Sequence, residues 1–228
     1  MNFESQLRSN ILKAAEDMHR GGTRFASFRT AKCNEKYWHL TNQGGFLLRK
    51  GVTPADGIRD IFTDGKKYAF ECAVAIVILL YKAVLDTIGE QKFNELFPNL
   101  LLYSWNYDSD LGLTTRNTDS AFARPGDVLY FKNPDVDPDH MEWQGENVIK
   151  MGTDSYYGHG LGIRSAEDMI KALNKRRIPG ASESAYLLDQ ISYPDYAYLS
   201  QFAPADSRSF QPLWLPVTAQ IGGLQYRE

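Results

Sequence analysis

The order of hydrophobic and polar residues divides the chain into a helical first part and a strand-rich second part. Apolar residues recur at helical spacing over residues 7–18, and the glycines at 21 and 22 end that helix. Thr53 followed by Pro54 is typical of a helix start. A long apolar run begins near Cys72 and continues to residue 85. The pattern therefore predicts helices at residues 7–18, from 53 onward, at 72–85 and at 91–97.

Short apolar or alternating stretches predict strands at residues 24–28, 37–40, 100–105, 127–131, 146–151 and 156–163. Ser165 opens a Ser-x-x-acid pattern that predicts one more helix. After residue 188 the prolines at 194, 204, 212 and 216 predict loops. Because helices precede strands and no βαβ alternation is visible, we expect one α+β domain over residues 1–228.

Composition and charge exclude several classes of protein. The net charge of −3 gives no electrostatic footprint for nucleic acid or for an anionic membrane. The apolar run after Cys72 meets Lys82 and Asp86 too soon to span a bilayer, which needs about 20 apolar residues. The start of the chain lacks a signal-peptide core. Two cysteines form no disulfide framework and suit a reducing compartment, so a cytoplasmic protein is expected.

Cys72 is the candidate nucleophile. It follows a polar stretch and stands in the first turn of the predicted buried helix. The partial positive charge at a helix N-terminus favours thiolate over thiol, and the thiolate is the form that attacks acyl groups. The alternative is that Cys72 is a small hydrophobic residue packed in a core helix.

A nucleophilic thiol needs a base, and two residues are candidates. His159 lies in a predicted strand with glycine at every other position, where a ligand or another backbone can approach closely. Glu146 enters an apolar strand near Trp143, and burial would raise its pKa towards that of a thiol. From the residues alone His159 ranks above Glu146, although a purely structural strand histidine is an equal alternative.

Two metal-binding patterns are incomplete. Asp135, Asp137 and Asp139, with Glu146 at the twelfth place, imitate a calcium-binding EF-hand loop, but His140 stands where the turn needs glycine. Cys33 and His39 have no neighbours that would complete a zinc site. No metal and no cofactor is expected.

Four stretches resemble the small spore-coat transglutaminases of Bacillus. They are YAFECAxAIVI at residues 68–78, LYFKNP at 129–134, WxGENVI at 143–149 and HGLGI at 159–163. Residues 25–28, 55–61, 86–94 and 184–188 are also similar, so the resemblance extends from about residue 11 to about residue 190. It implies a compact papain-like α+β fold, with the nucleophile at a helix N-terminus packed on an antiparallel sheet.

The resemblance also implies an activity and a set of site residues. The family forms ε-(γ-glutamyl)lysine cross-links between proteins without calcium, and spore-coat proteins are the expected substrates. Cys72 corresponds to its nucleophile, Glu146 to its base and Glu71 to an auxiliary acid, which leaves His159 a supporting place. Phe25, Trp105 and Trp143 match aromatic residues that wall a narrow channel, with core packing as the alternative. A cytoplasmic enzyme deposited on the spore coat is therefore expected.

The similarity does not extend to residues 193–228, which form an aromatic-rich C-terminal extension of unknown role on the single domain. The loop at 114–124 also differs from the family.

Two other functions stay open. A papain-like cysteine peptidase or amidase would use Cys72 and His159 with water as the acceptor. A structural coat protein would keep the fold without activity, but the intact Cys72, Glu146 and His159 argue against it.

Overall fold

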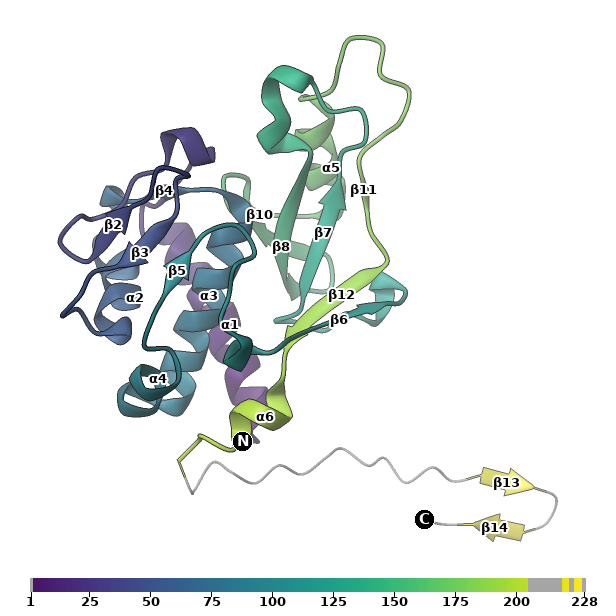
Figure 1. Cartoon of the computed structure of the whole chain (residues 1–228). Helices are drawn as coiled ribbons and strands as arrows, with labels where there is room; N and C mark the ends of the chain where they lie inside the picture. Colours follow the sequence, from purple (N-terminus) through teal and green to yellow (C-terminus); the bar gives the residue numbers. More distant parts are fainter. Residues whose placement is uncertain (1, 205–218, 222–223, 227–228) are drawn as a thin grey trace.

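The computed structural model describes residues 2–204, 219–221 and 224–226. Most of the helices lie on one side together with the smaller strand groups, and the largest antiparallel sheet lies on the other together with the helix at Ala166–Asn174 (Figure 1). The α-helices are α1 (Phe3–Arg20), α2 (Pro54–Thr63), α3 (Cys72–Ile88), α4 (Glu90–Leu96), α5 (Ala166–Asn174) and α6 (Tyr196–Ser200). Short 3-10 helices are η1 (Phe28–Thr30), η2 (Gly65–Lys67), η3 (Ser109–Leu111), η4 (Ser120–Phe122) and η5 (Pro138–Trp143).

The largest sheet has the order β10-β9-β8-β7-β12-β6, with β11 also paired to β7, and all its pairs are antiparallel. Its strands are β6 (Leu113–Asn117), β7 (Val128–Lys132), β8 (Gly145–Gly152), β9 (Ser155–Gly158), β10 (Gly162–Arg164), β11 (Tyr186–Leu187) and β12 (Gln190–Pro194). The smaller groups are β2 (Trp38–Leu40), β3 (Phe46–Leu48) and β5 (Leu101–Leu102), the parallel pair β1 (Arg24–Phe25) and β4 (Ala69–Phe70), and the pair β13 (Ala219–Ile221) and β14 (Leu224–Tyr226).

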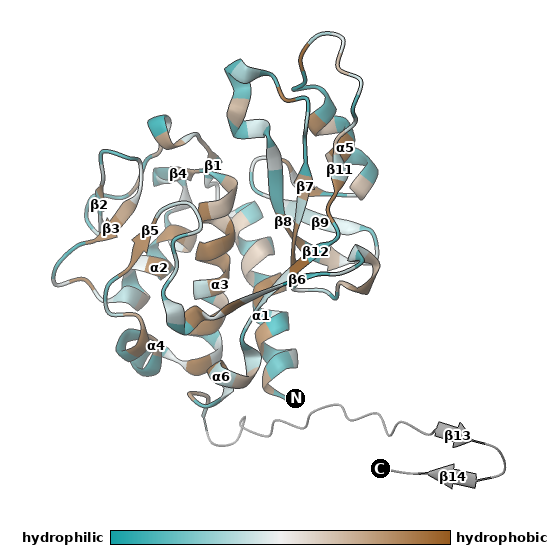
Figure 2. Ribbon diagram, turned by 45° about the vertical axis from the view of Figure 1, so that its right-hand side comes forward, coloured by the Kyte–Doolittle hydropathy of each residue, from teal (hydrophilic) through white to brown (hydrophobic). Residues whose placement is uncertain are grey.

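Helix α3 is the centre of the core. Every residue from Cys72 to Ile88 is buried except Lys82 and Asp86, which form an ion pair one turn apart. Such a helix is apolar on all sides because it is covered on all sides, and Figure 2 shows its hydrophobic colouring between the more polar outer helices. It packs against α1 and against β8. The predicted α+β class, with the cysteine-bearing helix on an antiparallel sheet, is confirmed.

The predicted helix starts at residues 53 and 165 are confirmed by their caps. Thr53 accepts a hydrogen bond from the backbone N–H of Asp56 at 3.2 Å, with Pro54 in the first helical position. Ser165 accepts from the N–H of Asp168 at 3.2 Å. Within the described residues no helix is both long and apolar enough to cross a bilayer.

The single strand predicted for residues 156–163 is wrong. The chain turns back within this stretch, so that β9 pairs with β10 and Gly158 faces Gly162. Gly160 and Gly162 have φ values of 98° and 81°, a left-handed region that other residues adopt only at a cost in free energy. The alternating glycines therefore mark a tight hairpin. The stretch predicted as a strand at 100–105 is likewise shorter, since β5 ends at Leu102 and Ser104 turns the chain with a φ of 49°.

Residues 189–204 are not the loop that the prolines suggested. β12 inserts between β7 and β6 in the main sheet. Helix α6 then buries Tyr196 and Leu199 in the same core as α1 and α3. The first part of the predicted 193–228 extension thus belongs to the body of the fold. Residues 205–218, 222–223 and 227–228 of that extension lie outside the described residues.

Candidate active site

The site is built around the first turn of α3. Strand β4 delivers the chain to Glu71, whose carboxylate caps the helix by accepting a hydrogen bond from the N–H of Ala73 at 2.9 Å. Cys72 is the first residue of the helix and is 2% exposed. The predicted position of the thiol, in the first turn of a buried helix, is therefore what the structure shows.

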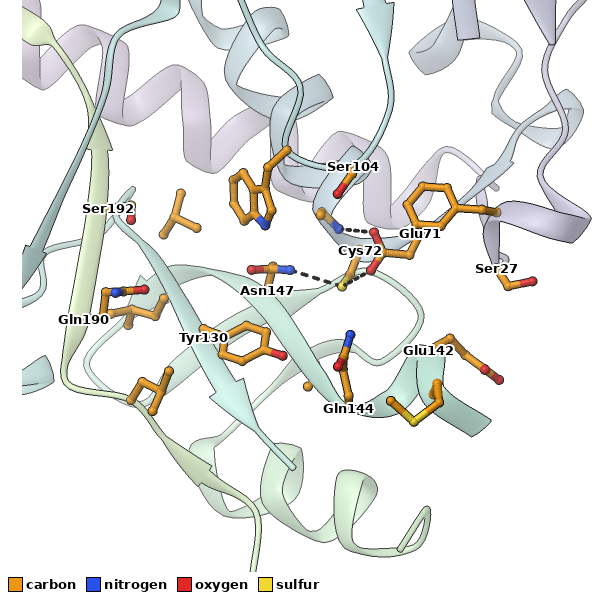
Figure 3. A pocket seen from close by; sticks show the side chains of 18 of the residues that line it. Ser27, Glu71, Cys72, Ser104, Tyr130, Glu142, Gln144, Asn147, Gln190 and Ser192 are labelled. Atoms are coloured by element: carbon orange, nitrogen blue, oxygen red, sulfur yellow. Dashed lines mark hydrogen bonds between the residues drawn. The ribbon is translucent and has the colours of Figure 1, made fainter. Parts of the chain in front are cut away.

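Two side chains hold the Cys72 sulfur from opposite sides (Figure 3). The thiol donates to Oε1 of Glu71 at 3.0 Å. The side-chain amide of Asn147 donates to Sγ at 3.3 Å. Because the thiol hydrogen points to Glu71, the sulfur accepts on its other side, and this requires the nitrogen end of the Asn147 amide to face it.

The thiol is held in its neutral form. Burial raises the pKa of Cys72 well above its ordinary value, and the nearby charges of Glu146 and Glu71 raise it further. The backbone amide of Asn147 acts in the opposite direction and lowers it. The helix N-terminus was expected to favour the thiolate, but desolvation and two carboxylates outweigh that effect in the resting structure.

Glu146 is a buried carboxyl group in β8. It is 0% exposed, and neither of its oxygens has a hydrogen-bond partner among the described residues. Burial raises the pKa of Glu146 well above its ordinary value, and the charge of Glu71 raises it further. The backbone amide of His159 acts in the opposite direction and lowers the pKa of Glu146, without reaching hydrogen-bond geometry.

His159 is fully engaged elsewhere. Its Nε2 lies 3.1 Å from the backbone carbonyl of Arg24, which can only accept, so Nε2 carries the hydrogen. Its Nδ1 then accepts from the hydroxyl of Tyr157 at 3.3 Å. The ring stacks on Phe70 with centroids 4.6 Å apart, and burial lowers the pKa of His159 to about 4. Among the described residues no hydrogen bond joins His159 to Cys72 or Glu146, so the imidazole is a neutral buried group.

The three aromatic residues expected to line a channel lie in two places. Trp105, 37% exposed, lines a hollow of about 1260 Å³ into which Cys72, Glu71 and Asn147 also project. Phe25 and Trp143 pack on each other with ring centroids 4.6 Å apart, outside the lining of that hollow. Phe25 also lies beside His159, at 6.3 Å between ring centroids.

The acidic loop after β7 has a structural role, because its first aspartate binds the backbone of a distant loop. The carboxylate of Asp135 accepts hydrogen bonds from the backbone amides of Ser182 at 3.0 Å and Glu183 at 2.9 Å. In the part of the chain that the structure describes, no three His, Cys, Asp or Glu side chains gather as a metal site would require. Cys33 is half-buried, and burial raises its pKa to about 11.

A model of the protein-glutamine gamma-glutamyltransferase family matches residues 1–203. The chain belongs to this family. A relative from Bacillus pumilus is 49% identical over 199 residues, covering 87% of this chain and 80% of its own. A relative from Bacillus mycoides is 44% identical over 217 residues, covering 95% of this chain and 78% of its own. Both carry the name protein-glutamine gamma-glutamyltransferase.

The fold agrees with this assignment. The solved transglutaminase from Geobacillus stearothermophilus, without its C-terminal extension, superposes with a TM-score of 0.84 at 51% identity, covering 89% of this chain and 96% of that one. The resemblance to transglutaminases seen in the sequence is therefore confirmed, and the chain is an acyltransferase that acts on glutamine and lysine side chains of proteins.

Sequence reasoning missed Asn147. It stands directly after Glu146 within a stretch quoted for the resemblance, but an asparagine in an apolar strand gives no signal of its own. Only the position of β8 beside α3 shows that its amide reaches the sulfur.

Proposed function

We propose that the chain cross-links proteins without calcium, through a thioester on Cys72 and with Glu146 as the base. The observation that carries this proposal is the arrangement at the start of α3. A buried thiol is hydrogen-bonded on two sides, and its pKa responds to the charge of Glu146, a buried carboxylate without a hydrogen-bond partner in the described part of the chain. Burial raises the pKa of a carboxyl group and makes its carboxylate a stronger base. The difference between its pKa and that of a thiol becomes smaller.

The reaction follows from these groups. Glu146 takes the thiol proton, and the Cys72 thiolate attacks the side-chain carboxamide carbon of a protein glutamine. Collapse of the tetrahedral intermediate breaks the C–N bond, and the departing nitrogen takes the proton back from Glu146 and leaves as ammonia. A lysine amine then attacks the thioester, loses a proton to Glu146 and receives the acyl group as an isopeptide, which returns the thiol.

The other predicted residues have secondary roles in this scheme. Glu71, the proposed auxiliary acid, caps the helix and accepts the hydrogen of the resting thiol. Trp105 lines the hollow beside the thiol and can shield the thioester from water. Phe25 packs beside His159 and against Trp143, so these two rings support His159 from one side. His159 supports the site as a neutral group.

A peptidase using Cys72 and His159 is the second candidate, and the geometry favours it less. Its base must accept a proton from the thiol, whereas both ring nitrogens of His159 are hydrogen-bonded to Arg24 and Tyr157.

Spore-coat proteins are the proposed substrates, and the spore coat is the proposed location of the enzyme. The support is the resemblance to coat enzymes and the Bacillus origin of the relatives.

The test is amine incorporation into casein and ammonia release, both with EDTA present, for the wild type and Cys72→Ala. We expect the wild type to incorporate a fluorescent primary amine and release ammonia, and the variant to do neither. Incorporation that survives in the variant would overturn the assignment of Cys72. Loss of wild-type activity with EDTA, restored by calcium, would overturn calcium independence, and cleavage of casein without incorporation would favour the peptidase.

A further inference from the structure

Among the described residues, the side chains of Glu71 and Asn147 hydrogen-bond to the Cys72 sulfur, and the proposed function gives no role to Asn147. It is 7% exposed, and its amide nitrogen lies 3.3 Å from Cys72 Sγ. The other side-chain hydrogen bond that the structure gives this sulfur goes to Glu71, which accepts. Among the described residues, Asn147 is therefore the side chain that donates to the nucleophile.

The position of Asn147 follows from the alternation of β8. Consecutive residues of a strand point to opposite faces. Asn147 lines the hollow with Cys72 and Trp105, and its register partner on β7, Tyr130, lines the same hollow. Glu146 points the other way, towards Gly158 of β9. The proposed base and the amide donor thus come from consecutive residues of one strand, and of the two only Asn147 makes a hydrogen bond to the sulfur.

A thiolate at this place needs a donor. Cys72 is 2% exposed, so water gives its sulfur little solvation. Glu71 lies 3.0 Å away and turns from a hydrogen-bond acceptor into a repelling charge when the thiol ionises. Hydrogen bonds to ionised groups are roughly twice as strong as those between neutral groups. The contact from Asn147 therefore strengthens at the moment when the contact to Glu71 is lost.

We propose that Asn147 is a further catalytic residue, whose side-chain amide holds the Cys72 sulfur and stabilises the thiolate as its proton leaves. This inference rests on the proposed role of Cys72 as the nucleophile. It assigns the acid–base step to Glu146 and the stabilisation of the sulfur anion to Asn147.

The test measures ionisation of the thiol separately from turnover. All variants carry Cys33→Ser, so that Cys72 is the sole thiol. The rate of alkylation by iodoacetamide is followed over a pH series for the parent, Asn147→Ala and Asn147→Asp. Asn94→Asp is the matched control, because it adds the same charge in α4, where the side-chain oxygen of Asn94 accepts from the N–H of Ala55 and an aspartate can still accept.

We expect Asn147→Asp to slow alkylation at neutral pH by about 10-fold or more, because a donor to the anion is replaced by a third carboxylate. The pH at which alkylation rises should move upwards, with a smaller shift in the same direction for Asn147→Ala and none for the control. With a glutamine peptide and an amine, kcat should fall while KM changes little. Thermal unfolding shows whether each variant folds. An Asn147 variant that does not fold is replaced by Asn147→Ser, which keeps a shorter donor.

An unchanged alkylation profile in Asn147→Ala would overturn the inference even if activity fell, because a merely structural role leaves ionisation of the thiol unmoved. The two proposals fail in different ways. If the parent incorporates no amine, the proposed function fails while alkylation still reports on Asn147. If the parent is active through Cys72 and its alkylation does not depend on Asn147, only the present inference fails.

Discussion

Glu146 lies directly against Gly158, with no room between them for a side chain. A Cβ placed on Gly158 would come within 2.8 Å of Cγ and 2.9 Å of Oε1 of Glu146. Distances under 3 Å are not sustained between such atoms, so an alanine here must displace the carboxyl group. The glycine at the end of β9 therefore sets where the buried Glu146 points.

Gly158→Ala should reduce amine incorporation strongly and lower the free energy of unfolding by about 1–3 kcal/mol, the usual cost of overpacking. Gly152→Ala in the neighbouring hairpin is the control, because the nearest atom to its new Cβ is that of Ser155 at 3.8 Å. Chemical denaturation and the transfer assay measure the two effects. Equal losses of transfer activity and of stability in both variants would show that the contact between Gly158 and Glu146 has no effect of its own.

Glu146→Gln should lower kcat for amine transfer by about 10²–10⁴-fold, the contribution of general base catalysis. The same change removes a charge that raises the pKa of Cys72, so iodoacetamide should alkylate the thiol faster at neutral pH. A more reactive thiol with less transfer is the result that separates a base from a structural residue. Glu167→Gln, at an exposed position of α5, is the charge control. Retention of transfer activity in Glu146→Gln would contradict its role as base.

Glu71→Gln should also speed alkylation of Cys72 at neutral pH, because Glu71 raises the pKa of the thiol by its charge and by its hydrogen bond. The start of α3 should survive, since a glutamine oxygen can still accept from the N–H of Ala73. Alkylation rates and thermal unfolding together check this. Slower alkylation would mean that the carboxylate positions the sulfur more than it repels the anion.

His159→Gln should weaken the acid dependence of stability. Burial lowers the pKa of His159 in the folded protein to about 4, whereas an unfolded histidine titrates near 6.5. The unfolded chain therefore takes up a proton first as the pH falls. Full stability holds above about pH 6.5, and the free energy of unfolding falls by up to about 1.4 kcal/mol per pH unit down to about pH 4.

Urea denaturation at pH 7 and at lower pH, compared between wild type and His159→Gln, measures this difference. His39→Gln, at an exposed position of β2, reports the effect of removing an imidazole from the surface. Parallel curves for wild type and His159→Gln would show that His159 does not titrate between these limits. In the transfer assay, His159→Ala should cost less activity than Glu146→Gln, and the reverse order would restore a cysteine–histidine pair.

The sequence by itself determined the helical core and the place of the nucleophile. The apolar run after Cys72 has one structural solution, a buried helix, and the caps at Thr53 and Ser165 are local hydrogen bonds within three residues. Motif similarity then identified the family, because the stretches around Cys72 and Glu146 are long. Local patterns predict such features well since their causes are close together along the chain.

Only the tertiary structure decided which groups meet the thiol and in what state. Asn147 reaches Cys72 across 75 positions of sequence, and the hydrogen-bond partner of His159 Nε2, Arg24, is 135 positions away. The alternating glycines at 158, 160 and 162 suggested one continuous strand, whereas the left-handed backbone of Gly160 and Gly162 turns the chain into a hairpin in which Gly158 pairs with Gly162. The position of Cys72 at a helix N-terminus predicted a stabilised thiolate, but burial and the charges of Glu146 and Glu71 raise the pKa of Cys72 and favour the neutral thiol. Desolvation and contacts between distant strands depend on how the elements pack, and periodicity along the chain does not encode them.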